Sequence, residues 1–163
     1  MGYEVFTSIL VPIDCAESEK QKTLAELATK HFKIFESDEE WCGNKTVLHF
    51  LQSVKDQRCI FSSSKGWGLA WAAEGNYCNA EDIVEELKLF FLDLYQNRIA
   101  LRFNHIIVIT SPIFGPEDKP PTTVVEIGLN SEGDYKVRFG KEITLNDMSI
   151  NSYEAEWKFG PRY

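Results

Sequence analysis

Histidine is the first residue type to consider, because its imidazole transfers protons near neutral pH and ligates metals. The chain has 3 histidines. His31 falls within an apolar helical pattern, where a histidine is more often a core residue than a ligand. His49 and His105 fall within β-like runs and are candidates for one shared site. A metal site is not predicted, because the chain has neither a zincin histidine pair nor a CxxC pair.

Motifs of the common enzyme classes are absent from the sequence. Two-histidine phosphoesterases have Ser or Thr two positions after each histidine, where this chain has Leu51 and Ile107. There is no GxSxG elbow, P-loop, calcium loop or dinucleotide fingerprint. Residues 62–68 contain small residues and a lysine, but they lead into a β-like run instead of a helix. We therefore predict no catalytic residue, no metal and no cofactor.

The cysteines do not form a recognisable framework. Spacings of 27, 17 and 19 residues are unlike those of small disulfide-rich domains, so reduced and mostly buried thiols in the cytoplasm are predicted. Cys78 precedes a predicted helix. The alternative to an inert thiol at this position is a thiolate that the helix dipole stabilises. The start of the chain lacks the pattern of a signal peptide or a membrane span. The residues concerned are Cys15, Cys42, Cys59 and Cys78.

The charge balance favours some partners over others. The formal net charge is -8, from 25 acidic and 17 basic residues. Binding to phosphate backbones depends mainly on Lys and Arg, so nucleic acid is not an expected partner. An acidic surface instead steers association with a basic protein, and that is the partner we expect.

The first half of the chain is predicted to contain one strand, one helix and three shorter strands. A strand is expected over residues 5–13, and an amphipathic helix follows from Ser18 to Phe35. The β-like runs cover residues 46–54, 58–62 and 67–73.

A second helix is predicted from an N-cap at Asn79 to Arg98. Its apolar stripe is expected to be buried and comprises Ile83, Val84, Leu87, Phe90, Phe91, Leu94 and Tyr95.

The second half of the chain is predicted to be a strand, a proline-rich loop, a hairpin and a last strand. These elements are expected over residues 105–109, 111–121, 124–139 and 153–159. The predicted fold class is α+β, with a mostly antiparallel sheet of about six to eight strands and two amphipathic helices packed on it. Residues 1–163 are expected to form a single domain.

Two surfaces are candidates for partner binding. The first is an acidic run that ends in an aromatic residue, and the second is a pair of leucines that falls away from the apolar stripe of the second helix. A solvated loop, and a helix covered on two sides, are the structural alternatives. The candidate residues are Glu36, Asp38, Glu39, Glu40, Trp41, Leu89 and Leu92.

Two functional hypotheses follow. The first is a non-enzymatic, acidic protein-binding module, such as an inhibitor; its class and charge resemble those of immunity proteins that neutralise basic toxin domains, although no motif carries the likeness. The second is a small-molecule-binding or hydrolytic enzyme with a pocket between the sheet and the second helix, using His49, His105 or nearby acidic residues. The oligomeric state is left open.

Overall fold

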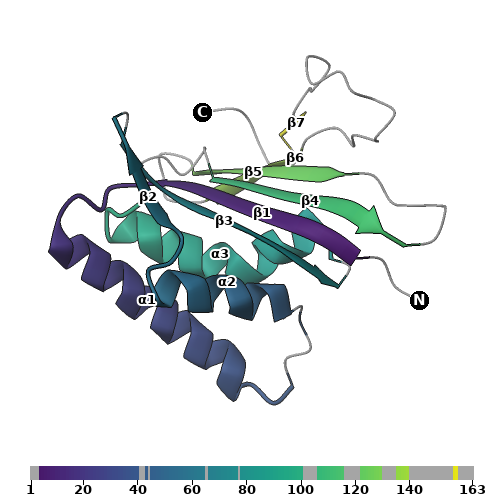
Figure 1. Ribbon diagram of the computed structural model, residues 1–163, viewed down its shortest axis with the longest axis horizontal. Helices are drawn as coiled ribbons and strands as arrows, with labels where there is room; N and C mark the ends of the chain where they lie inside the picture. Colours follow the sequence, from purple (N-terminus) through teal and green to yellow (C-terminus); the bar gives the residue numbers. More distant parts are fainter. Residues whose placement is uncertain are drawn as a thin grey trace.

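An antiparallel sheet forms the centre of the computed structural model (Figure 1). The structure describes residues 4–40, 43, 45–64, 66–76, 78–100, 106–115, 122–129, 135–139 and 156–157. Within these residues the sheet has 7 strands in the order β2-β3-β1-β4-β5-β6-β7, and all neighbouring strands pair antiparallel. The strands are β1 Glu4–Ile13, β2 Ile60–Ser63, β3 Gly66–Asn76, β4 Ile106–Phe114, β5 Thr123–Leu129, β6 Tyr135–Phe139 and β7 Glu156–Trp157.

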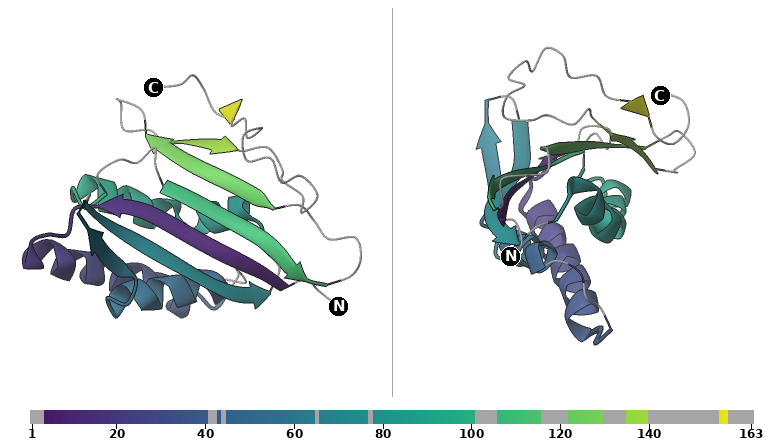
Figure 2. Two further views of the ribbon diagram at one scale, coloured as in Figure 1. Left: turned by 45° about the horizontal axis from the view of Figure 1, so that its top comes forward. Right: turned by 90° about the vertical axis from the view of Figure 1, so that its right-hand side faces the viewer.

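Three helices lie on one face of this sheet, as the two views of Figure 2 show. They are α1 (Ser18–Ser37), α2 (Lys45–Lys55) and α3 (Ala80–Gln96). The pattern of β1 agrees with one covered face, because every second residue from Val5 to Ile13 is buried. Phe6 and Leu10 point to the other face and are each 40% exposed. The α+β class and the antiparallel sheet are thus confirmed.

Helix α3 forms where its capping residues and apolar stripe predict it. The side chain of Asn79 accepts a hydrogen bond from the Asp82 backbone N–H at 2.8 Å, which satisfies one of the free donors at the helix start. The stripe is buried from Ile83 to Leu94. Tyr95 is an exception, since it is 41% exposed in the last turn of the helix and therefore does not belong to the core.

The prediction of a strand at residues 46–54 is wrong. These residues belong to α2, so the helices number three instead of two in the described part of the chain. The β-branched and aromatic residues of this run favour a strand locally, but its buried positions recur at helical spacing. Those positions are Thr46, Val47, Phe50, Leu51 and Val54. His49 consequently lies on a helix.

Strand β4 also differs from its prediction, because it continues through Ser111 and Pro112 to Phe114. Proline cannot donate a ladder hydrogen bond and is tolerated mainly at strand edges and bulges. Pro112 lies at such an irregularity, because the register of β4 with β1 shifts between Glu4 and Val5, and Val5 is the residue opposite Pro112.

The remaining strand predictions have different outcomes. The hairpin over residues 124–139 is confirmed in its pairing, which joins β5 to β6. The expected last strand is described only at Glu156 and Trp157, which pair with β6; its other residues lie outside the described part.

Replacement of Phe91 tests the core. Phe91 is completely buried on α3, so Phe91→Ala is expected to lower the free energy of unfolding by about 3 to 5 kcal/mol. Urea denaturation measures this loss. The matched control is Leu89→Ala on the same helix, where the side chain is 61% exposed and a change below about 0.5 kcal/mol is expected. Equal losses for the two variants would contradict the placement of the helix.

Candidate functional site

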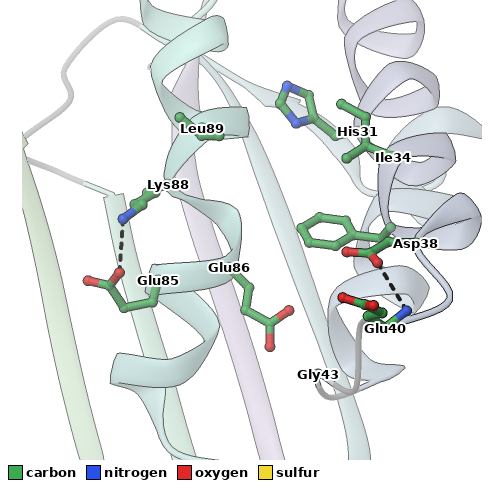
Figure 3. Close-up of a pocket in the computed structure, with 10 residues that line it drawn as sticks. His31, Ile34, Asp38, Glu40, Gly43, Glu85, Glu86, Lys88 and Leu89 are labelled. Atoms are coloured by element: carbon green, nitrogen blue, oxygen red, sulfur yellow. Dashed lines mark hydrogen bonds and ion pairs between the residues drawn. The ribbon is translucent and has the colours of Figure 1, made fainter.

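A groove of about 690 Å³ lies between α1 and α3 (Figure 3). One wall comes from the C-terminal half of α1 and the segment after it, and the other comes from the middle of α3. Its lining combines exposed apolar side chains with carboxylates. The lining residues are His31, Ile34, Phe35, Asp38, Glu40, Gly43, Glu85, Glu86, Lys88 and Leu89.

The apolar part of the groove comes from both helices. Ile34 of α1 is 53% exposed and Leu89 of α3 is 61% exposed. Phe35 is partly buried and packs against the core, so it connects the groove to the interior. Scattered exposed leucines are common in proteins, and here two large exposed aliphatic side chains lie on facing walls of one concave surface.

Carboxylates surround this apolar strip. Asp38 and Glu40 follow α1, and Glu85 and Glu86 lie on α3. The cation in the lining is Lys88, and its ammonium group lies 3.0 Å from Glu85. The groove therefore carries a negative charge, like the whole chain.

The acidic end of α1 is folded locally. Asp38 is the C-cap residue, and its Oδ1 accepts a hydrogen bond from the Glu40 backbone N–H at 3.1 Å. The C-terminal end of a helix carries partial negative charge and favours cations, yet the last turn of α1 has no basic residue. The carboxylates at this end therefore interact unfavourably with the helix dipole.

A buried histidine links the two walls of the groove. His31 is 6% exposed, and its Nε2 lies 2.6 Å from Asp93 Oδ2 on α3. Lys30 also donates to Asp93 Oδ2, at 3.1 Å, and the ring of His31 meets that of Phe90 edge to face at 5.6 Å. Burial raises the pKa of the Asp93 carboxyl, but the hydrogen bonds from His31 and Lys30 outweigh it and bring the pKa below its ordinary value.

Three of the predicted partner-binding residues line this groove. Asp38 and Glu40 come from the acidic run, and Leu89 comes from the second predicted surface, so the fold joins the two surfaces. Glu36 and Glu39 are exposed beside the groove without lining it. Trp41 lies outside the described residues. Leu92 is partly buried, packs against the core and is not among the lining residues.

The sequence reasoning missed the contributions of Ile34, Glu85 and Glu86. Ile34 falls off the buried face of α1, and this deviation was the available signal. The sequence pattern around Glu85 and Glu86 indicated only a solvated helix face. Their meeting with α1 depends on contacts between residues far apart in the chain.

The structure describes two of the three histidines, so the shared site of His49 and His105 is not tested. His31 is paired with Asp93 in the wall of the groove, and His49 lies on α2 beside a separate hollow of about 440 Å³. His105 lies outside the described residues. Among the residues that are described, no group of three or more His, Cys, Asp or Glu side chains is arranged to hold a metal ion.

The described cysteines have the properties of inert core thiols. Cys15, Cys59 and Cys78 are free and buried, and Cys42 lies outside the described residues. Burial raises the pKa of the Cys15 thiol to about 11, and the nearby Asp14 carboxylate raises it as well. Burial also raises the pKa of Cys78, which disfavours the alternative of a thiolate stabilised by α3.

Comparisons with known proteins do not place the chain in a family: no family model, curated protein or solved structure matches it. None of the helices in the described part of the chain combines the length and apolar character needed to cross a membrane.

The contact between His31 and Asp93 predicts a pH-dependent stability. Asp93→Asn should lower the free energy of unfolding by about 1 to 3 kcal/mol at pH 7, because charged hydrogen bonds are lost. Since the pKa of Asp93 is lowered in the folded state, its contribution is complete above the unfolded value of about 3.9 and disappears as the pH falls through the folded value. Urea melts of the wild type and of Asp93→Asn should show that the difference in free energy of unfolding is smaller near pH 2.5 than at pH 7.

The control for this experiment is Asp56→Asn. Asp56 is exposed and accepts a hydrogen bond from Gln52, four residues earlier. Its variant should stay within about 0.5 kcal/mol of the wild type at pH 7. If the free energies of unfolding of the wild type and Asp93→Asn differed by the same amount at both pH values, the charged pairing would be contradicted.

Thiol reactivity tests the core position of the cysteines. In a Cys42→Ser variant, the described thiols should react with Ellman's reagent on the order of 100-fold more slowly in the native state than in guanidinium chloride. At pH 8 a pKa of about 11 leaves roughly one Cys15 thiol in a thousand ionised, which adds to the protection by burial. Rapid reaction of one native thiol would identify an accessible or activated cysteine.

Proposed function

We propose that the chain is a protein-binding module whose groove between α1 and α3 receives a basic, amphipathic segment of a partner protein. The observation that carries this proposal is the pairing of exposed Ile34 and Leu89 across a groove rimmed by carboxylates. A basic amphipathic helix has matching features, with apolar side chains on one face and Lys or Arg beside them. The partner's apolar residues would lie between Ile34 and Leu89, and its cations would lie near Asp38, Glu40 and Glu86.

The two kinds of residue have different roles in this proposal. Apolar side chains at the centre of an interface contribute most of the affinity and slow dissociation. Charges at the rim accelerate encounter with a partner of opposite sign, and salt weakens that effect. Ile34 and Leu89 therefore anchor the partner, and the surrounding carboxylates attract it.

The proposed biological role is inhibition of a basic protein in the cytoplasm, in the manner of an immunity protein that neutralises a toxin domain. The net charge of -8 supports a basic partner, and the free thiols of Cys15, Cys59 and Cys78 support a reducing compartment. The acidic groove supplies a surface that could cover a basic functional site on the partner. Nucleic acid and membranes are not proposed as partners.

The enzyme hypothesis remains as the alternative. His49 and the polar residues around it line a hollow, so a small ligand there is the form that this hypothesis takes. Substitutions in the groove between α1 and α3 distinguish the two, because they should affect a protein partner and leave a ligand beside His49 unaffected.

Binding kinetics test the proposed function. The partner is first isolated from the native host with the full chain as bait and is then immobilised for surface plasmon resonance at two salt concentrations. Asp38→Asn combined with Glu40→Gln should slow association about 3- to 10-fold and reduce its salt dependence. Leu89→Ala should instead raise the dissociation rate about tenfold or more, because an anchor is lost.

The matched control is Glu19→Gln combined with Glu26→Gln. Like the groove variant, it removes two negative charges. Its positions are exposed on α1 and do not line the groove. Its association rate should stay within about twofold of the wild type. Wild-type kinetics for both groove variants would exclude the groove as the interface.

A further inference from the structure

A buried polar side chain belongs to the lining of the groove between α1 and α3. It is His31, which is 6% exposed. Figure 3 shows its imidazole projecting from α1 toward α3, on the side of Leu89. Its hydrogen-bond partner Asp93 is not among the lining residues. The imidazole therefore connects a contact inside the protein with the surface of the groove.

The positions of the protons on this imidazole follow from the contact with Asp93. Burial raises the pKa of the Asp93 carboxyl, but its hydrogen bonds bring the pKa below the ordinary value, so at neutral pH Asp93 is a carboxylate and accepts hydrogen bonds. His31 Nε2, 2.6 Å from Asp93 Oδ2, is therefore the donor. In the neutral imidazole the other nitrogen, Nδ1, then has a free electron pair and is an acceptor.

This acceptor has no partner in the described part of the chain. There the contacts of His31 are the hydrogen bond from Nε2 to Asp93 and the edge-to-face contact with Phe90 at 5.6 Å. The two nitrogens point in divergent directions from the ring, so the contact with Asp93 leaves Nδ1 available. A buried acceptor without a donor is unfavourable. A donor that a bound molecule brings into the groove removes this cost.

The surroundings of His31 indicate the kind of donor that suits the groove. Ile34 and Leu89 present large exposed aliphatic side chains on the facing walls. A hydroxyl or amide on a short side chain leaves this apolar surface uncovered, whereas Trp and Tyr combine a large ring with one N–H or O–H at its edge. The volume of about 690 Å³ is sufficient, because sites for whole small ligands occupy roughly 300 to 1,000 Å³.

We propose that His31 Nδ1 accepts a hydrogen bond from an aromatic anchor of the partner, either a Trp indole N–H or a Tyr phenol O–H, whose ring lies between Ile34 and Leu89. This inference rests on the proposed function, because it names the anchor of the basic segment that the groove receives. Lys or Arg residues beside the anchor lie near Asp38 and Glu40. Trp and Tyr are also the residue types that most often carry the binding energy of an interface.

Small cationic aromatic compounds test this hydrogen bond without knowledge of the partner. Tryptamine has an indole N–H and an ammonium group, and its analogue methylated at the indole nitrogen lacks the donor. Tyramine and phenethylamine form a second pair, in which only the phenol hydroxyl differs. Titrations of the isotope-labelled full chain are followed by NMR. In each pair the compound with the donor should bind about 5- to 10-fold more tightly.

The nitrogen resonances of His31 give a readout that a purely structural role does not move. At pH 8 the free protein should show a protonated Nε2 and an unprotonated Nδ1. Tryptamine should move the Nδ1 resonance upfield, as acceptance of a hydrogen bond does. The analogue methylated at the indole nitrogen should leave this resonance near its position in the free protein.

A pair of variants locates the effect within the groove. His31→Phe removes the acceptor and keeps a ring beside Phe90, so the two members of each pair should bind equally and phenethylamine should bind as to the wild type. Leu89→Ala on the facing wall should weaken all four compounds and keep the difference within each pair. Thermal melts check that both variants are folded. If His31→Phe is unfolded, the two pairs and the nitrogen resonances of the wild type decide.

Three results overturn the proposed hydrogen bond. They are equal affinity within both pairs of compounds, a proton on Nδ1 in the free protein, and no binding of tryptamine up to about 10 mM, roughly the weakest affinity worth testing. The isolated partner separates this inference from the proposed function. Partner kinetics unchanged in folded His31→Phe but altered in Leu89→Ala would leave the proposed function intact and exclude the hydrogen bond. Unchanged partner kinetics in all groove variants would contradict the proposed function itself.

Discussion

The ring of Phe90 is the point at which the three helices meet, and the groove depends on this contact. Phe90 on α3 lies edge to face with Phe50 of α2 at 6.0 Å and with His31 of α1 at 5.6 Å. Aromatic pairs of this kind stabilise beyond the burial of their area and restrict the angle between elements. The preceding residue of α3, Leu89, instead lines the groove. One helical turn therefore supplies both a core contact and an exposed apolar side chain.

The contact between His31 and Asp93 extends this arrangement to the polar side of the helices. A buried imidazole needs a hydrogen-bond partner, and Asp93 provides one across the interface between α1 and α3. The position of α1 against α3 is thus set by packing at Phe90 and by a charged hydrogen bond one turn away. Beyond these contacts α1 ends in carboxylates that its own dipole disfavours. The groove consequently combines a packed base with an acidic rim whose charge is unfavourable for the dipole of α1.

The sequence predicted those features that depend on local pattern. Helix α3 has a capping residue, acids in its first turn and a long stripe with helical spacing, and these agree with one another. Helix α2 has only 11 residues, and its Thr, Val and Phe content favours a strand, so tertiary burial decided its structure. The sequence pattern predicted the acidic run and Leu89 as two separate surfaces, but it did not predict that they line one groove. It depends on a contact such as His31 to Asp93, which joins residues 62 apart in the chain.

The groove and the hollow beside β3 share one lining residue, Gly43, in the segment between α1 and α2. In the proposed complex, a partner segment that leaves the groove at this point would lie close to the hollow lined by His49 and Glu74. Once one part of a partner is bound, the other part binds from a high effective concentration, so two weak contacts combine into a much tighter one. A partner that contacted both the groove and the hollow would therefore bind more tightly than one that contacted the groove alone.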